Sequence, residues 1–220
     1  MIRIGVTGTD TGVGKTIVSC ALIAALQRSV GRVAAMKPVE SGGSADAERL
    51  RTAAGMTHPM HLVCPISLAE PLAPLVAARR ANITVDVQIL DSAFSELCAT
   101  SDAIVVEGAG GLLVPITEIE SFATLFKRWD LDLMIVAPNR LGTINHTLLT
   151  VRAARDHGLR VRAVVLNAVC GQPRDVAELT NLALLQELLP DVAVTQFAFM
   201  DRPGDPPNTT LKDFGLDDVV

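Results

Sequence analysis

The chain has 220 residues, of which 49% are hydrophobic, 20% charged and only 3% aromatic, and its formal charge is −5. These values predict a single α/β domain over 1–220 with an aliphatic core, and they argue against disorder. The acidic balance argues against a nucleic-acid surface, and no apolar run approaches the roughly 18 residues that span a bilayer, so we expect a cytoplasmic protein with small-molecule partners.

Strands and helices are predicted to alternate along the chain. Short apolar runs rich in β-branched residues predict buried strands at 2–7, 33–37, 103–107, 133–137, 161–167 and 192–199. Apolar residues spaced three and four apart predict helices at 16–28, 87–97, 147–156 and 176–189. This alternation requires crossover connections, so the sheet should be mostly parallel with helices on both faces.

Two regions are predicted to be less regular. The stretch 56–82 contains four prolines and should form loops with one short helix at 75–79. The tail from residue 201 is rich in proline and glycine and is expected to wrap the surface.

A glycine-rich loop follows the first predicted strand and leads into the first predicted helix. Its sequence from Gly8 to Thr16 is GTDTGVGKT, which ends in the Gly-Lys-Thr triplet of a P-loop. The backbone N–H groups of such a loop wrap phosphates, Lys15 would reach the β and γ phosphates, and the Thr16 hydroxyl would ligate magnesium. The usual spacing places the first glycine at position 9, where Thr9 stands. The segment therefore predicts a variant P-loop that binds a nucleoside triphosphate and Mg²⁺.

Lys37 ends the second predicted strand and opens the run KPVESGG over 37–43. Parallel sheets bind ligands at the carboxyl ends of their strands. If this strand neighbours the first, Lys37 lies beside Lys15, and two ammonium groups in an acidic protein need an anion between them. The alternative is an ordinary solvated lysine.

Two acidic residues are candidates for the same region. Glu107 ends the third predicted strand and opens EGAGG, and its carboxylate suits a hard cation. The alternative is an exposed glutamate beside a glycine hairpin. Asp46 begins a helical pattern, where sequence alone favours a simple interaction with the helix dipole.

The cysteines and histidines give no strong metal signal. The four cysteines form no CxxC pair, so neither a disulfide framework nor a zinc ribbon is indicated; they are Cys20, Cys64, Cys98 and Cys170. His58, His61 and Cys64 are spaced three apart, but a structural zinc site needs a fourth ligand.

Taken together, five segments resemble the dethiobiotin synthetase family of P-loop enzymes. They are GTDTGVGKT at 8–16, KPVESG at 37–42, EPLAP at 70–74, EGAGG at 107–111 and GTINHT at 142–147. The similarity runs in order from residue 2 to about residue 190, and the early Gly8 also suits that family. The resemblance implies the three-layer P-loop NTPase fold, with a mostly parallel sheet flanked by helices.

The resemblance also implies a reaction. Members of the family close the ureido ring of dethiobiotin from 7,8-diaminopelargonate, CO₂ and ATP with Mg²⁺, a carbon–nitrogen ligase reaction of biotin biosynthesis. One amine takes up CO₂ as a carbamate, and a carbamate oxygen attacks the γ phosphate. The second amine then displaces phosphate from the mixed anhydride.

Residue roles follow from the resemblance. Catalysis would depend on Lys15, Lys37 and Thr11, and Mg²⁺ would be surrounded by Thr16, Asp46 and Glu107. The nucleotide would be bound by Gly12, Val13, Gly14, Lys15, Thr16, Ile17, Asp46, Glu107, Gly108, Ala109, Gly110, Asn167 and Ala168. The substrate would be bound by Thr11, Lys37, Ser41, Gly142, Thr143, Ile144 and Asn145.

Two of these assignments extend beyond the phosphate site. The Asn167 amide could pair with both donor and acceptor edges of adenine, although a turn residue after a strand is the alternative. The segment 142–145 resembles the one whose backbone amides bind the substrate carboxylate across a subunit interface. A homodimer is therefore implied.

The main competing interpretation is a P-loop switch ATPase of the kind that partitions plasmids or places division sites. Those proteins usually carry a second lysine early in the P-loop, where this chain has Gly8, Thr9 and Asp10. They also need a basic or amphipathic surface for DNA or membrane, which the sequence does not show. An amidoligase that activates a corrinoid carboxylate would add a glutamine-hydrolysing domain, and a nonenzymatic module would leave the two lysines unexplained.

Overall fold

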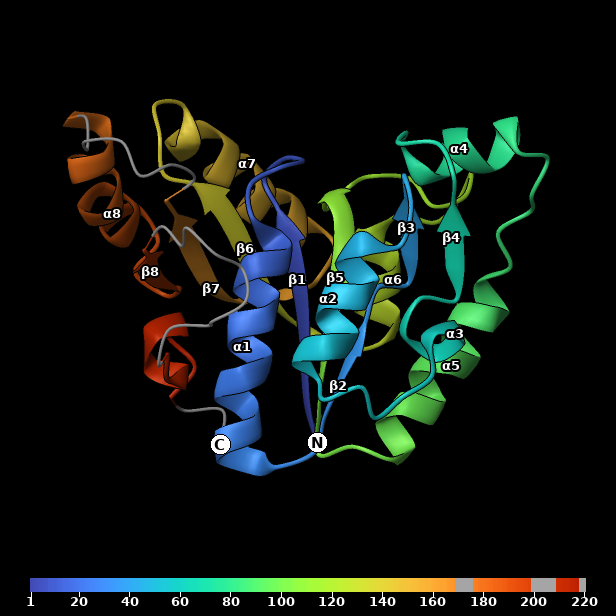
Figure 1. Cartoon of the computed structure of the whole chain (residues 1–220). Coiled ribbons are helices and arrows are strands. Elements are labelled where there is room, and N and C mark those ends of the chain that lie inside the picture. Colours follow the sequence, from blue (N-terminus) through green and yellow to red (C-terminus); the bar gives the residue numbers. More distant parts are fainter. Residues whose placement is uncertain (169–175, 199–208, 218–220) are drawn as a thin grey trace.

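The computed structural model describes residues 1–168, 176–198 and 209–217, and within them a parallel sheet carries helices on both faces (Figure 1). The large sheet has the strand order β2-β5-β1-β6-β7-β8. These strands are β1 (Ile2–Gly8), β2 (Val33–Met36), β5 (Ala103–Gly111), β6 (Asp132–Pro138), β7 (Arg160–Asn167) and β8 (Ala193–Phe197). The predicted α/β class and all six predicted strands are confirmed.

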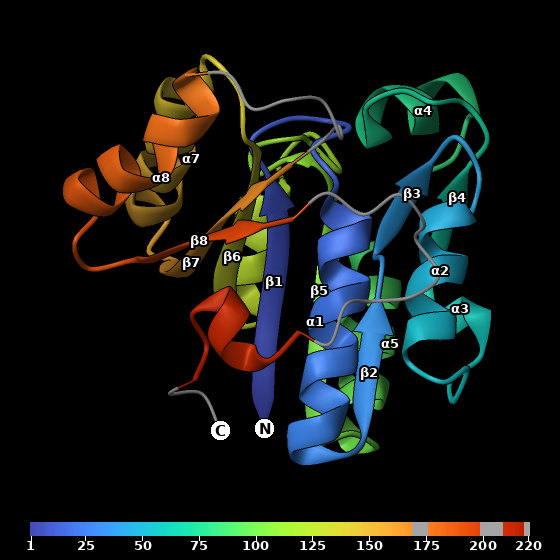
Figure 2. The same cartoon turned by 60° about the vertical axis from the view of Figure 1, so that its left-hand side comes forward.

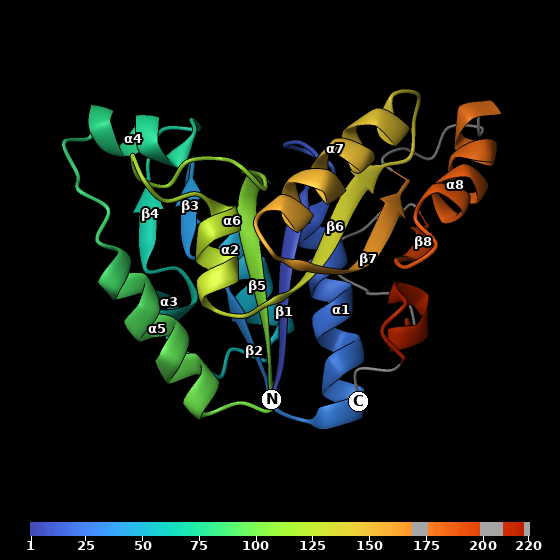
Figure 3. The same cartoon turned by 180° about the vertical axis from the view of Figure 1, so that it is seen from behind.

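Helices cover the two faces unequally (Figures 2 and 3). One face packs against α1 (Lys15–Val30), α2 (Ala45–Ala53) and the short 3-10 helix η1 (Leu211–Phe214). The other packs against α5 (Val87–Ala99), α6 (Phe122–Arg128), α7 (Thr143–Asp156) and α8 (Val176–Leu188). Among the described residues, no helix combines the length and the hydropathy needed to cross a bilayer.

A smaller parallel sheet lies beside the large one. It pairs β3 (Val39–Ser41) with β4 (Ile66–Leu68), and α3 (Met60–Val63) and α4 (Pro74–Arg80) flank it. The short helix predicted at 75–79 is confirmed as α4. The strands β3 and β4 and the helix α3 are not predicted, because three or four residues are too few for a clear apolar period. The helix α6 is not predicted either.

A hydrophobic core lies on each face of the large sheet, and the side chains of β5 alternate between the two. Ala103 and Val105 pack on the α1 face, whereas Ile104 and Val106 pack on the opposite face. At Gly5 of the neighbouring β1, an added Cβ would lie 3.0 Å from the Phe126 ring. Glycine there lets the fully buried aromatic ring lie directly against the strand.

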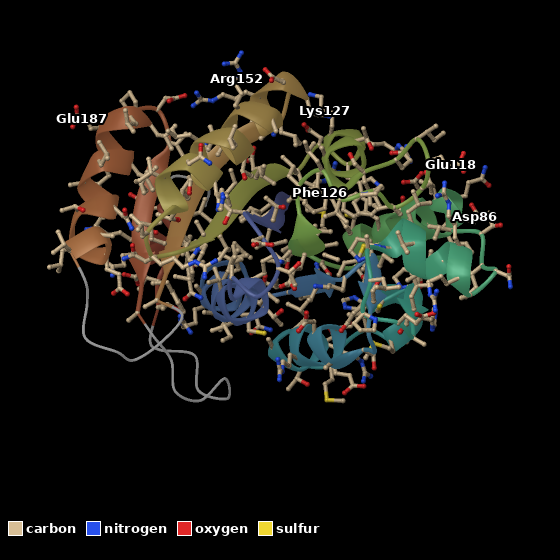
Figure 4. The ribbon with its side chains drawn as sticks, turned by 90° about the horizontal axis from the view of Figure 1, so that it is seen from above. Asp86, Glu118, Phe126, Lys127, Arg152 and Glu187 are labelled. Atoms are coloured by element: carbon tan, nitrogen blue, oxygen red, sulfur yellow. The ribbon has the colours of Figure 1, made fainter. Side chains whose placement is uncertain are left out.

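Figure 4 shows how sharply side chains divide between the interior and the surface. Phe126 of α6 lies in the interior, whereas the next residue, Lys127, is exposed. The other labelled residues also lie at the periphery and are exposed: Asp86, Glu118, Arg152 and Glu187. These charged side chains therefore lie on the outside of the molecule, as expected for an aliphatic core.

The start of α7 and the end of β8 differ from the predicted boundaries. The helix predicted at 147–156 begins at Thr143 instead, because Gly142 has φ +92° and turns the chain directly into the helix while the first turn carries little apolar signal. The last predicted strand ends at Phe197. The end predicted for that strand, residue 199, lies outside the described residues, as do Cys170 and residues 201–208 of the predicted surface tail.

Candidate active site

The P-loop connects β1 to α1 at the carboxyl edge of the sheet, the upper edge in Figure 1. Gly12 and Gly14 have φ of +74° and +91°, a backbone region that favours glycine. Gly14 caps α1 with no side-chain hydrogen bond, and the first turn of the helix contains no acidic residue. The N-terminal amides of α1 are therefore available to bind an anion.

A cavity of about 640 Å³ opens at this edge. Its walls come from the P-loop, β3, the start of α2, the segment before α4 and the end of β5. Most residues predicted to bind nucleotide or substrate line it: Thr11, Gly12, Gly14, Lys15, Thr16, Ile17, Lys37, Ser41, Asp46, Ala109 and Gly110. The fold thus gathers residues from four distant parts of the sequence.

Lys37 is the centre of a buried polar cluster beneath this cavity. Its Nζ lies 2.6 Å from Glu107 Oε1 and 3.3 Å from Asp46 Oδ2, and it donates to the Gly108 carbonyl at 3.2 Å. The side chains of Lys37 and Glu107 are 3% and 0% exposed. Burial opposes the charge on Lys37, but the carboxylates of Glu107 and Asp46 outweigh it and raise the pKa of Lys37. Lys37 is therefore a fixed ammonium group.

Lys15 is the second cation of the cavity. Its Nζ donates to the Asp10 carbonyl at 3.2 Å. Burial, followed by the nearby charge of Lys37, lowers the pKa of Lys15 from its ordinary 10.5 to about 8. The expected pairing of the two lysines is present, and an anion between them would relieve their repulsion.

The prediction that Lys37 lies beside Lys15 assumed that the second strand neighbours the first, and the strand order of the sheet is different. The β2 strand, which precedes Lys37, does not neighbour β1, because β5 lies between them. In the register of the sheet, Val6 of β1 lies opposite Glu107 of β5. Glu107 lies within β5, between the strands that precede the two lysines, and its charge acts on both of them.

The donor atoms around Glu107 of β5 fit magnesium. Thr16 Oγ1 donates to Glu107 Oε1 at 2.9 Å, and Asp46 contacts the same cluster through Lys37. Within the described residues, Glu107 Oε2 is buried without a hydrogen-bond partner, an arrangement that calls for an unseen ion or water. Hydroxyl and carboxylate oxygens without sulfur or imidazole suit a hard divalent cation.

Asn167 lies beside the P-loop rather than in the wall of the cavity. Its buried side chain donates from Nδ2 to the Val13 carbonyl at 2.9 Å. The following residue, Ala168, donates its N–H to the Phe197 carbonyl of β8 at 3.0 Å. This end of β7 therefore contacts the loop that would hold the phosphates.

Comparison with known proteins identifies the family. A family model described as an AAA domain matches residues 3–195. The chain is 43% identical to the ATP-dependent dethiobiotin synthetase BioD of Anaeromyxobacter sp. (strain Fw109-5), over 83% of this chain and 87% of that protein. It is 34% identical to the protein of the same name from Thermodesulfovibrio yellowstonii, over 98% and 97% of the two chains. The chain belongs to the dethiobiotin synthetase family.

One segment predicted from the family resemblance lies apart from the cavity. Gly142, Thr143, Ile144 and Asn145 form the N-cap and first turn of α7, and none of them lines the cavity. No acidic residue stands in this first turn. The segment has the backbone of an anion site, but its own chain's cavity does not include it.

In this member of the dethiobiotin synthetase family, seven further residues line the cavity that were not assigned to the site from the sequence. They are Glu40, Arg49, Pro71, Leu72, Ala73, Pro74 and Val114. Glu40 and the stretch from Pro71 to Pro74 lie in segments that carry the family resemblance, so a signal was present. Arg49 lies three residues after Asp46, but its helix was recognised only at its start.

Proposed function

We propose that this chain is an ATP-dependent dethiobiotin synthetase, which closes the ureido ring of dethiobiotin from 7,8-diaminopelargonate, CO₂ and ATP in the cytoplasm. The observation that carries the proposal is the convergence of Lys15 and Lys37 with Thr16, Asp46 and Glu107 around one cavity. The relatives that bear this name cover most of the chain.

The two lysines match the charge that develops during the reaction. A carbamate, a carbamic-phosphoric anhydride and phosphate are all anionic. Lys37 binds the carbamate and the transferring phosphoryl group, and Lys15 binds the β and γ phosphates. Because the polar cluster already holds Lys37 in place, little reorganisation accompanies the reaction.

The remaining residues hold the nucleotide and the diamine. The P-loop amides and Ile17 contact the phosphates, Gly108 to Gly110 approach the nucleotide, and Asn167 with Ala168 meets the base. Thr16, Asp46 and Glu107 hold Mg²⁺, which when bound offsets negative charge on the triphosphate. Thr11 and Ser41 contact the diamine, and the Ser41 hydroxyl is buried without a partner among the described residues.

Coupling between hydrolysis and synthesis tests this function. We expect Mg²⁺-dependent ADP release that requires both the diamine and bicarbonate or CO₂, with dethiobiotin formed in equal amount. ADP is measured by a coupled assay, and dethiobiotin is identified by mass spectrometry. Omitting each substrate in turn is the control. Equal ADP release without the diamine would favour a switch ATPase instead.

We also propose that the protein acts as a homodimer in which α7 of one copy completes the cavity of the other. Support comes from the α7 N-terminus outside its own chain's cavity and from Leu141 beside it, which is 83% exposed. A carboxylate of the diamine chain would bind the amides of 142–145 in the partner.

Mixing two inactive variants tests this arrangement. Lys37→Ala and Gly142→Asp each disable one half of a shared site, so equal mixtures that exchange subunits should regain about a quarter of wild-type activity. Sedimentation equilibrium measures the oligomeric state. A monomer at all concentrations, or no regain of activity in a mixture with verified exchange, contradicts the shared site.

A further inference from the structure

Glu40 of β3 is a buried acidic residue for which the reaction gives no direct use. It follows Lys37 by three residues and is 6% exposed. Its Oε1 accepts the N–H of Asp46 at 2.9 Å, and its Oε2 accepts the N–H of Ala47, also at 2.9 Å. Both oxygens of one carboxylate are therefore bound by consecutive amides in the first turn of α2.

This contact replaces the usual cap of a helix. The first N–H groups of a helix have no partner within it and are commonly satisfied by the N-cap side chain. Ser44 holds the N-cap position of α2 but makes no side-chain cap, and its hydroxyl donates to Glu48 Oε1 at 2.8 Å. Glu40 supplies the cap from a different element, with a negative charge at the positive end of the helix dipole.

One of the two amides that Glu40 binds is the backbone N–H of Asp46. The Asp46 side chain is 38% exposed, and its charged partners are Lys37 at 3.3 Å and Arg49 at 3.9 Å. Where the carboxylate lies therefore depends on its ion pair with Lys37 and on the position of its backbone. The backbone at this point is held by the hydrogen bonds that the amides of Asp46 and Ala47 donate to the Glu40 carboxylate on β3.

We infer that Glu40 is a positioning residue, whose two hydrogen bonds to the first turn of α2 hold the Asp46 carboxylate in place for the divalent cation of the nucleotide. The inference rests on the proposed function, because it takes Asp46 as part of the metal site. Glu40 acts through Asp46 and does not bind the metal. This role also explains why an acidic side chain lines a cavity built for anions, since the neighbouring amides offset its charge.

Metal binding is the readout that a purely structural role would not change. In Glu40→Gln the side-chain NH₂ faces a backbone N–H, so one of the two hydrogen bonds is lost. We expect the dissociation constant of Mn²⁺, measured by electron paramagnetic resonance with a bound non-hydrolysable ATP analogue, to rise about tenfold. Metal-free nucleotide affinity stays unchanged, and kcat recovers at saturating Mg²⁺. Glu187→Gln, at an exposed glutamate on α8, is the matched control and should leave Mn²⁺ affinity unchanged.

A double-mutant cycle shows whether Glu40 acts through Asp46. Asp46→Asn alone should weaken Mn²⁺ binding, and Glu40→Gln should weaken it no further in that background. Circular dichroism and thermal unfolding verify the fold of each variant. Glu40→Asp keeps the charge but is one methylene shorter, so it gives a second variant with the same expectation.

The outcomes separate the two proposals. If Asp46→Asn leaves Mn²⁺ affinity unchanged, the proposed metal site is wrong. If Asp46→Asn weakens Mn²⁺ binding but neither Glu40 variant does, the positioning role is overturned while the metal site stands. The role is also overturned if the effects of Glu40 and Asp46 add fully, or if Glu40→Gln raises only the KM for the diamine.

Discussion

Lys37→Ala should lower the rate of dethiobiotin formation about 10³-fold, the loss typical of removing a preorganised group that stabilises charge in a transition state. The ammonium of Lys37 is held within 3.3 Å of Glu107, Gly108 and Asp46, so its removal takes away the positive charge at that position. Turnover is measured by mass spectrometry of the product at saturating substrates. Near-wild-type turnover in this variant would show that Lys37 has no part in catalysis.

The same substitution should also destabilise the protein. Without Lys37, the fully buried Glu107 loses its counter-charge, and breaking a buried pair in this way costs roughly 3–5 kcal/mol. Adding Glu107→Gln should recover much of the lost stability but none of the turnover, which separates catalysis from folding. Lys212→Ala, at an exposed lysine on η1, is the matched control and should change neither property.

Gly14→Ala should weaken nucleotide binding by roughly 10- to 100-fold. An alanine at this position would strain the P-loop backbone by about 1–3 kcal/mol, and a loop that shifts to relieve the strain binds phosphate less well. Gly14 has φ +91°, and an added Cβ would lie 2.1 Å from Asn167 Nδ2. The Asn167 amide cannot turn away without losing its bond to the Val13 carbonyl. The substitution therefore disturbs the phosphate loop and the proposed base contact together.

Titration with a fluorescent ATP analogue measures this effect. Gly55→Ala is the control, because Gly55 has a similar φ of +77° but an added Cβ there would have no neighbour closer than 4.0 Å. That variant should lose some stability and keep wild-type nucleotide affinity. Equal affinities in the two variants would mean that the contact with Asn167 is unimportant for binding.

The sequence predicts much of the large sheet because long apolar runs and crossover helices leave few arrangements. It does not predict that β5 separates β1 from β2, since strand order depends on contacts between distant segments. The three-residue strands β3 and β4 are missed because a strand of that length has no measurable period.

In the site, too, features that depend on neighbouring residues are predicted from the sequence, whereas contacts between distant segments are not. The phosphate loop is visible because its spacing is local. Asp46 looks like an ordinary first-turn acid until the resemblance and then the contact with Lys37 single it out. Glu40 is still harder to recognise, because its role depends on a helix that begins only after the chain has turned back. The role proposed for the segment 142–145 would need a second copy of the chain, which a single sequence does not display.

The helices α1 and α7 begin in the same way, with a left-handed glycine, no side-chain cap and no acid in the first turn. In the proposed enzyme one of these ends faces phosphate and the other a carboxylate. Peptide amides do not titrate, so the attraction that these two helix ends exert on anions would not change with pH, whereas Lys15, with its pKa of about 8, would lose its charge at higher pH. Discrimination between the two anions would then come from the shape of the surroundings and from the lysines that only the phosphate end possesses.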